Sequence, residues 1–251
     1  MAKVIAVANQ KGGVGKTTTC VNLCAALTRR GRRVLLADCD PQGNSTSGMG
    51  VSKDAMPNIY DVLARGENVS DCIIKTEYGH VLPSNKELSG ASVELVGAEK
   101  REFILKDAFL PIREDYDYIL IDCPPSLELL TVNALAAADS VLIPVQCEYY
   151  ALEGIADLMT TIKLTKRRVN PELEIQGIVL TMYDSRTKFS DQVAAEVEKF
   201  FGTAVYKTRI PRNVRIAEAP SHGVPIIQYD RLSKGSRAYL HLANELIKRE
   251  E

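Results

Sequence analysis

The sequence of 251 residues lacks several features that would place it in a specialised class of protein. It contains no apolar run of the roughly 18 residues that a membrane-spanning helix requires, and its first residues carry neither a cationic leader nor a cleavage signal. Charge of one sign is not in excess, because 31 Lys and Arg residues stand against 32 Asp and Glu residues. We therefore expect a cytoplasmic protein in which any DNA-binding surface is local.

Paired metal or redox ligands are also missing. The chain has six cysteines but no C-x-x-C pair, and only three histidines. Cys20 and Cys24 share one face of an expected helix, yet no histidine lies near them in the sequence to complete a metal site. We expect buried, reduced thiols with a structural role at all six positions, which are Cys20, Cys24, Cys39, Cys72, Cys123 and Cys147.

The composition is that of a globular domain, with 45% hydrophobic and 25% charged residues. Apolar runs typical of buried strands alternate with helical patterns, which predicts an α/β fold: a mostly parallel twisted sheet with helices on both faces. Residues 1–251 are expected to form one domain, and the region from about 50 to 90 is less regular than the rest. The predicted strands lie at residues 4–8, 34–37, 118–121, 141–143 and 178–180.

Residues 11–17 read Lys-Gly-Gly-Val-Gly-Lys-Thr and stand between the first predicted strand and a helix expected over residues 18–29. In this context glycines let successive backbone N–H groups point at phosphate oxygens, and the helix N-terminus adds partial positive charge. Lys16 would reach the terminal phosphates and the Thr17 hydroxyl would bind Mg²⁺. The predicted phosphate-binding residues are Lys11, Gly12, Gly13, Val14, Gly15, Lys16, Thr17 and Thr18.

This loop departs from the usual pattern G-x-x-x-x-G-K-[ST] in two ways. Gln10 stands where the first glycine is expected, and Lys11 adds a second lysine. A triphosphate already has its ammonium group in Lys16, so the second lysine could serve the same phosphates or those of a neighbouring molecule.

Acidic residues end two of the predicted strands. Asp122 follows residues 118–121, which is typical of a carboxylate that holds Mg²⁺ beside a triphosphate, although a turn or helix-capping role is the alternative. Asp38 and Asp40 end another strand, and we expect one to contact metal-bound water and the other, Asp40, to orient the attacking water. A simple turn at Asp40-Pro41 is compatible with that task.

Longer motifs extend over almost the whole chain. Residues 9–19 read N-Q-K-G-G-V-G-K-T-T-T, 38–44 read D-C-D-P-Q-G-N, and 121–126 read I-D-C-P-P-S. They are followed by P-V-Q-C-E-Y-Y-A-L-E-G at 144–154, T-M-Y-D-S-R-T at 181–187 and I-P-R-N-V-R-I-A-E-A-P at 210–220. Together these motifs strongly resemble the ParA family of partition ATPases, and within it the short chromosomal members called Soj, which are P-loop NTPase-like.

The resemblance implies roles for residues in and near the phosphate loop. Lys11 would be the lysine that crosses to the nucleotide of a partner subunit, and Gly12 would lie where the partner backbone approaches. Asp40 would be needed for hydrolysis. Pro211 and Asn213 fall in the segment that resembles the adenine-contacting loop.

The resemblance also implies a homodimer bound to ATP that holds double-stranded DNA without sequence preference, associates with the nucleoid and drives chromosome or plasmid partition. Slow Mg²⁺-dependent hydrolysis of ATP to ADP would be stimulated by a ParB-type centromere-binding protein. Arg186 and Arg215 occupy the motif positions expected to contact DNA, where arginine suits bidentate hydrogen bonding to phosphate. Further candidates are Lys188, Lys207, Arg209, Arg212 and Arg237.

Other functions of related ATPases are less compatible with the sequence. The chain begins directly at its first strand, so no N-terminal helix-turn-helix extension is expected. A MinD-like membrane-associated ATPase is the main alternative, because Leu240, Leu246 and Ile247 could form a membrane face, but the closing acids oppose an anionic membrane and a core-facing helix is the ordinary explanation. An iron–sulfur reductase and a passive nucleotide-binding adaptor are the remaining alternatives.

Overall fold

Seven strands form one sheet in the order β3-β4-β2-β5-β1-β6-β7. The structure is a computed structural model that describes residues 1–126, 128–148 and 151–250. All neighbouring strands pair in parallel except β3 with β4. The strands are β1 Lys3–Val7, β2 Val34–Asp38, β3 Ile74–Thr76, β4 Gly79–Leu82, β5 Tyr118–Asp122, β6 Ser140–Gln146 and β7 Glu174–Thr181.

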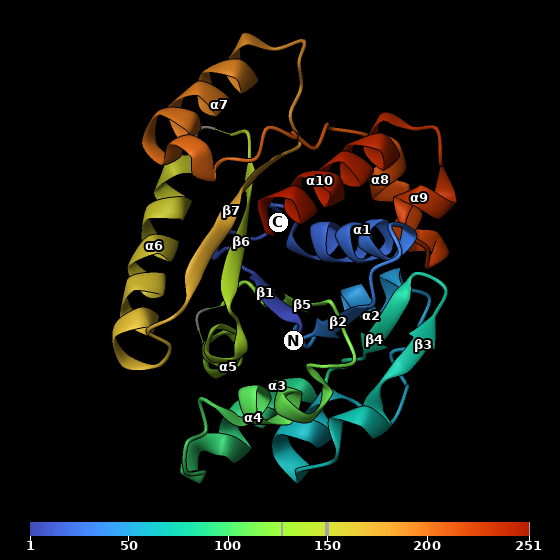
Figure 1. Cartoon of the computed structure of the whole chain (residues 1–251), viewed down its shortest axis with the longest axis vertical. Coiled ribbons are helices and arrows are strands. Elements are labelled where there is room, and N and C mark those ends of the chain that lie inside the picture. Colours follow the sequence, from blue (N-terminus) through green and yellow to red (C-terminus); the bar gives the residue numbers. More distant parts are fainter. Residues whose placement is uncertain (127, 149–150, 251) are drawn as a thin grey trace.

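Helices cover both faces of the sheet, and α1 and α10 lie side by side on one of them (Figure 1). The α-helices are α1 Lys16–Arg29, α2 Asn44–Gly48, α3 Leu88–Glu94, α4 Ile104–Phe109, α5 Leu129–Ala137, α6 Ala151–Arg168, α7 Lys188–Phe201, α8 Val214–Glu218, α9 Ile226–Tyr229 and α10 Lys234–Glu250. Short helical turns are η1 Asp61–Arg65, η2 Val69–Cys72, η3 Leu95–Gly97, η4 Leu110–Ile112, η5 Gly202–Ala204 and η6 Ala219–His222. The predicted fold class is confirmed.

The central strands are apolar over most of their length, with polar residues at their ends, because both faces of the sheet are buried. In β1, Val4 and Ala6 belong to the core under α3 to α7, while Ile5 and Val7 belong to the core under α1 and α10. Successive side chains of a strand point to opposite faces, so a continuous apolar run is what two buried faces require.

The region from 50 to 90 holds more regular structure than its sequence indicates. It contributes β3 and β4, and β4 extends the parallel sheet beside β2. Neither strand was among the predicted ones, because each is only three or four residues long and β3 is partly exposed at the sheet edge.

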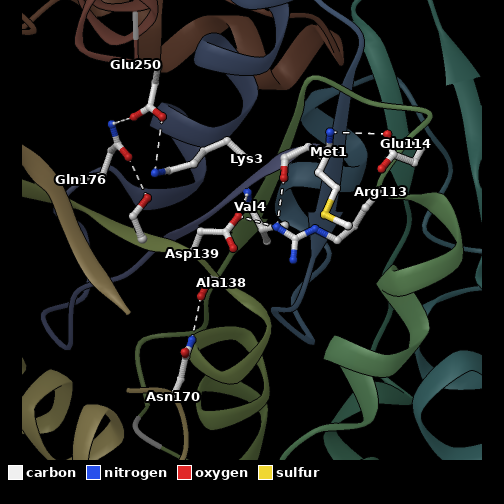
Figure 2. Close-up of polar contacts among 12 residues, drawn as sticks. Met1, Lys3, Val4, Arg113, Glu114, Ala138, Asp139, Asn170, Gln176 and Glu250 are labelled. Carbon is white, nitrogen blue, oxygen red and sulfur yellow. Dashed lines mark hydrogen bonds and ion pairs between the residues drawn. The ribbon is translucent and has the colours of Figure 1, made fainter. Parts of the chain in front are cut away.

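Polar contacts fasten the end of the sheet where β1 begins (Figure 2). The Arg113 guanidinium donates to the Asp139 carboxylate at 2.6 Å, and the same carboxylate oxygen accepts from the Val4 backbone N–H at 2.8 Å. Lys3 pairs with Glu250 of α10 at 3.4 Å. These contacts fix the start of β1, and therefore the position of the loop that follows its other end.

The apolar residues of α10 face the protein core. Leu246 is fully buried, and Leu240 and Ile247 pack partly against the same core as α1. Over the described part of the chain, no helix has both the length and the apolar character that crossing a membrane would need.

Candidate functional site

The loop between β1 and α1 lies at the carboxyl ends of the parallel strands, where open sheets of this kind bind ligands. Gly13 and Gly15 have positive φ angles of 75° and 92°, which glycine adopts without strain. A Cβ placed on Gly12 or Gly13 would meet no atom within 4 Å, so the loop borders open space. Among the described residues no side chain caps α1 at Gly15, and its first N–H groups are left for a ligand.

Lys16 is held inside this loop. Its side chain is buried, and its Nζ donates to the backbone carbonyl of Lys11 at 3.2 Å. Burial lowers the pKa of Lys16, while the carboxylates of Asp122 and Asp40 act in the opposite direction. The two carboxylates favour the charged form of the buried ammonium, and it is this charge that would attract an anionic ligand.

Asp122 lies at the tip of β5, directly opposite Asp38 at the tip of β2. One Asp122 oxygen, Oδ2, accepts from the Ser45 hydroxyl, whereas Oδ1 is buried without a hydrogen-bond partner in the described part of the chain. Burial raises the pKa of Asp122 to about 6, against the lowering effect of the Ser45 and Thr17 hydroxyls. A buried carboxylate oxygen with unused acceptor capacity beside a threonine hydroxyl fits a hydrated Mg²⁺ ion.

Both carboxylate oxygens of Asp38 accept hydrogen bonds from residues that follow it in the chain. Its Oδ2 accepts from the N–H and the hydroxyl of Thr46, both at 2.8 Å, and its Oδ1 accepts from the Asp40 N–H at 3.2 Å. Burial and the charge of Asp122 raise the pKa of Asp38 to about 7. The described contacts make Asp38 a positioning residue for the loop that carries Asp40, and a metal contact by Asp38 stays a prediction.

Asp40 forms the expected turn and stays near the charged cluster. Its Oδ1 accepts from the Gln42 N–H at 3.0 Å, and its backbone carbonyl accepts from Gly43 and from the Ser84 hydroxyl, both at 2.9 Å. These bonds fix the turn while the carboxylate still acts electrostatically on Lys16 and Asp122. The turn and the catalytic task are therefore compatible.

Lys11 has a partner that sequence reasoning missed. Its Nζ lies 3.2 Å from Glu148 Oε2, and Gln146 at the end of β6 donates to the other oxygen of that carboxylate. The motif at 144–154 contains both residues, but its pattern gave no sign that Glu148 meets the phosphate loop. Tyr149 and Tyr150 of the same motif lie outside the described residues.

A cavity of about 370 Å³ adjoins the loop and contains the predicted adenine segment. Gly15 and Thr18 line it on one side, and Pro211 and Asn213 on the other. Thr181 fastens this side of the loop by donating to the Val14 carbonyl at 2.7 Å. Sequence reasoning missed Thr181 and Tyr239 as lining residues, because contacts between distant segments leave no local pattern.

The two arginines proposed for DNA are exposed but already paired. Arg186 forms a bidentate pair with Asp184 at 2.9 and 2.7 Å. Arg215 pairs with Glu218 at 2.9 Å and lies 3.7 Å from Asp230. Lys188 and Lys207 are exposed, and none of these four cations lines the cavity beside the phosphate loop.

The cysteines are confirmed as free and buried thiols, at all six positions. Within the described residues no group of three or more His, Cys, Asp or Glu side chains is arranged to hold a metal ion. A site built on Asp122, Thr17 and ligand oxygens would need only one such protein residue.

Comparison with known proteins agrees with this geometry. The family model described as an AAA domain matches residues 2–175. The chain is 55% identical over 249 residues to the sporulation initiation inhibitor protein Soj of Bacillus subtilis, with 98% of each chain covered. It is 50% identical to the chromosome-partitioning ATPase Soj of Thermus thermophilus, over 98% of this chain and 95% of that protein.

Solved structures share the fold. A Mycobacterium smegmatis protein titled cobyrinic acid a,c-diamide synthase, with bound ATP analogue and magnesium, has a TM-score of 0.87 and 39% identity over 100% of this chain and 96% of its own. The cell division ATPase MinD of Pyrococcus furiosus has a TM-score of 0.81 and 30% identity over 99% of this chain and 100% of its own. The ParA resemblance is thereby confirmed, and the chain belongs to the ParA/Soj family of chromosome-partitioning ATPases.

Proposed function

We propose that this protein is a Mg²⁺-dependent ATPase that dimerises with ATP, binds double-stranded DNA without sequence preference, and releases it after hydrolysis, so that chromosomes or plasmids are partitioned. The observation that carries the proposal is the cluster at the strand tips. There the buried Lys16 ammonium and the Asp40 carboxylate lie beside an open glycine loop, together with Asp122 Oδ1, which has no hydrogen-bond partner among the described residues.

The residues present fit Mg-ATP. The glycine loop leaves open space for phosphates, and the cavity lined by Pro211 and Asn213 continues from it on the side where a base would lie. Asp122 and the Thr17 hydroxyl would hold Mg²⁺, which supplies charge neutralisation for phosphoryl transfer. The M. smegmatis relative binds an ATP analogue and magnesium, as its title states.

Within this site each residue has a separate task. Lys16 neutralises charge on the terminal phosphates from its buried position. Asp40, on a turn fixed by Gln42, Gly43 and Ser84, orients the attacking water in line. Phosphoryl transfer depends on such positioning more than on a strong base, so an aspartate suffices for this task.

Dimerisation brings the second lysine into use. In the single chain Lys11 is held by Glu148 at the edge of the site, and on dimerisation it exchanges this partner for the phosphates of the other subunit's nucleotide. Nucleotide binding and dimer formation are then coupled thermodynamically. A ParB-type partner stimulates the slow hydrolysis, and DNA retention keeps the dimer on the nucleoid.

The test compares the wild type with Asp40→Ala in three states: without nucleotide, with ADP and with ATP. We expect light scattering to give a monomer in the first two states and a long-lived dimer of Asp40→Ala with ATP, which alone retains DNA in gel shifts. Asp54→Ala, an exposed aspartate outside the site, is the matched control and should hydrolyse ATP like the wild type. Unchanged phosphate release by Asp40→Ala, or DNA retention without nucleotide, would refute the proposal.

A further inference from the structure

The turn that carries Asp40 belongs to a loop that is closed by hydrogen bonds between its two ends. Asp38, at the tip of β2, accepts from the N–H and from the hydroxyl of Thr46 in α2, both at 2.8 Å. Asp40 lies within this loop, and its N–H donates to the other oxygen of Asp38 at 3.2 Å. The side chains of Asp38 and Thr46 are fully buried, so water does not compete for these bonds.

The Thr46 hydroxyl also joins the loop to a neighbouring strand. It accepts from the Ser84 N–H at 2.9 Å, and the Ser84 hydroxyl donates to the Asp40 carbonyl at 2.9 Å. Ser84 lies just beyond β4, and the pairing of β4 with β2 fixes its position. The hydroxyl of Thr46 is thus a donor and an acceptor at once, whereas a valine of nearly the same shape is neither.

Packing restricts the loop on both of its sides. Gly43 has a φ angle of 60°, and a Cβ added there would lie 2.6 Å from the backbone oxygen of Ser84. On the solvent side, Lys53 Nζ donates to the Gln42 carbonyl at 2.6 Å and to Asn44 Oδ1 at 3.1 Å. The loop is therefore held on its buried side by Ser84 and on its exposed side by Lys53.

These contacts fix the position of Asp40 and are separate from the proposed phosphate and base contacts. Over the described residues, neither Thr46 nor Lys53 lines the cavity beside the phosphate loop. In-line attack requires an accurately placed water, and a displacement of about 1 Å can lower a rate about 100-fold. Loosening the loop should therefore slow hydrolysis and leave ATP binding as it is.

We propose that Thr46 is a positioning residue for ATP hydrolysis, because its hydroxyl closes the loop that holds Asp40, and that Lys53 supports the same loop from the solvent side. This inference rests on the proposed function, since it requires Asp40 to orient the attacking water. It assigns to Thr46 an effect on turnover and none on ATP affinity or dimerisation.

The test compares kcat and KM for Mg-ATP, from phosphate release, in the wild type, Thr46→Val and Thr46→Ser. Thr46→Val should lower kcat about tenfold or more and leave KM unchanged. In light scattering with ATP it should form the long-lived dimer expected of Asp40→Ala. Thr46→Ser keeps the hydroxyl and should restore most of the turnover. As a matched control, Ser140→Ala removes a buried hydroxyl that donates to Gln176 at 2.7 Å at the start of β6, and should hydrolyse ATP like the wild type.

Two further variants show whether Thr46 acts through Asp40. In the Asp40→Ala background, Thr46→Val should lower the residual phosphate release no further, because the group that it positions is already absent. Lys53→Gln changes an exposed side chain and leaves the core intact. It should lower kcat about two- to fivefold with KM unchanged, since solvent weakens the contacts of an exposed ammonium.

Failure of this inference and failure of the proposed function give different results. If Asp40→Ala releases phosphate like the wild type, the proposed function fails. If Asp40→Ala is slow but Thr46→Val turns over like the wild type, the inference fails while the proposed function stands. The inference is also overturned if Thr46→Ser is as slow as Thr46→Val, or if Thr46→Val slows Asp40→Ala by the factor seen in the wild type. Should Thr46→Val not fold, Lys53→Gln decides, and a wild-type kcat for it overturns the inference.

Discussion

Substituting Glu148 by glutamine tests whether the second lysine is held back in the single chain. Glu148→Gln removes the carboxylate that lies 3.2 Å from Lys11 Nζ and keeps nearly the same side-chain volume. If Lys11 must leave Glu148 before it can reach the partner's nucleotide, breaking this ion pair makes dimerisation of the wild type less favourable. The variant has no such ion pair to break, so we expect its dimer with ATP to be tighter.

The magnitude follows from the exposure of the two side chains. Lys11 is 32% and Glu148 45% exposed, so solvent screens the pair and its contribution is about 0.2–1 kcal/mol. Two such pairs break when two chains associate, which gives about 0.4–2 kcal/mol and a dimer about two- to thirtyfold tighter. Salt screens partly exposed charges, so the difference between wild type and variant should shrink as ionic strength rises.

Sedimentation velocity over a range of protein concentrations, with ATP and in the Asp40→Ala background, measures the dimer constant directly. Glu172→Gln, an exposed acid that precedes β7, controls for the change in net charge and should leave the constant as it is. A weaker dimer for Glu148→Gln would show that the carboxylate contributes to the interface itself. The idea that Glu148 holds Lys11 in reserve would then be wrong.

Three further substitutions test other parts of the molecule. Gly12→Val should leave monomer stability and ATP binding unchanged in calorimetry, because a Cβ at this position meets no atom within 4 Å. The same variant should lose dimerisation in light scattering, and a normal dimer would contradict the proposed interface. The raised pKa values of Asp38 and Asp122, about 7 and about 6, mean that the nucleotide-free protein loses stability as the pH rises from about 4, the ordinary pKa of an aspartate, to about 7. Asp122→Asn should flatten this dependence by up to about 3 kcal/mol in urea titrations at pH 4 and pH 8, and an unaltered profile would argue against a strained carboxylate. At Gly177 the φ angle is 150°, and an added Cβ would lie only 2.5 Å from Tyr206 Cε2. Gly177→Ala should therefore lower the free energy of unfolding by about 2 kcal/mol or more in the same titrations. A variant as stable as the wild type would disprove that packing.

The sequence predicted the central sheet because its strands are buried on both faces. An apolar run forms the middle or the later part of each of the strands β1, β2, β5, β6 and β7, and each strand ends near its predicted position. The short strands β3 and β4 escaped prediction because their length and partial exposure leave too few apolar positions to show a period. Edge strands owe their pairing to the sheet they join, which a local pattern does not record.

In the candidate site too, residues placed by a local sequence pattern could be predicted, whereas residues brought in from distant segments could not. The placement of Gly15, Lys16 and Thr17 between a strand and a helix was predictable because the pattern typical of a phosphate loop is made by consecutive residues. Glu148 follows β6 and Thr181 ends β7, which places them 137 and 167 residues from their partners in the loop. Only the parallel order of the strands brings their carboxyl ends to one edge, so these contacts follow from topology and not from spacing.

Asp38 shows how a correct motif can still leave a residue's task open. The motif places two aspartates at one strand tip, and sequence alone permits either to face the metal. In the structure the Asp38 carboxylate accepts bonds from Thr46 and from the Asp40 N–H, while the opposite carboxylate of Asp122 keeps one oxygen unused. Two buried carboxylates side by side repel, and the pair is stabilised when one is satisfied by protein donors and the other by a bound cation. The segment after β2 gives Asp38 both N–H and hydroxyl donors and gives Asp122 the Ser45 hydroxyl, so we expect Asp122 to be the carboxylate that holds the proposed Mg²⁺ ion.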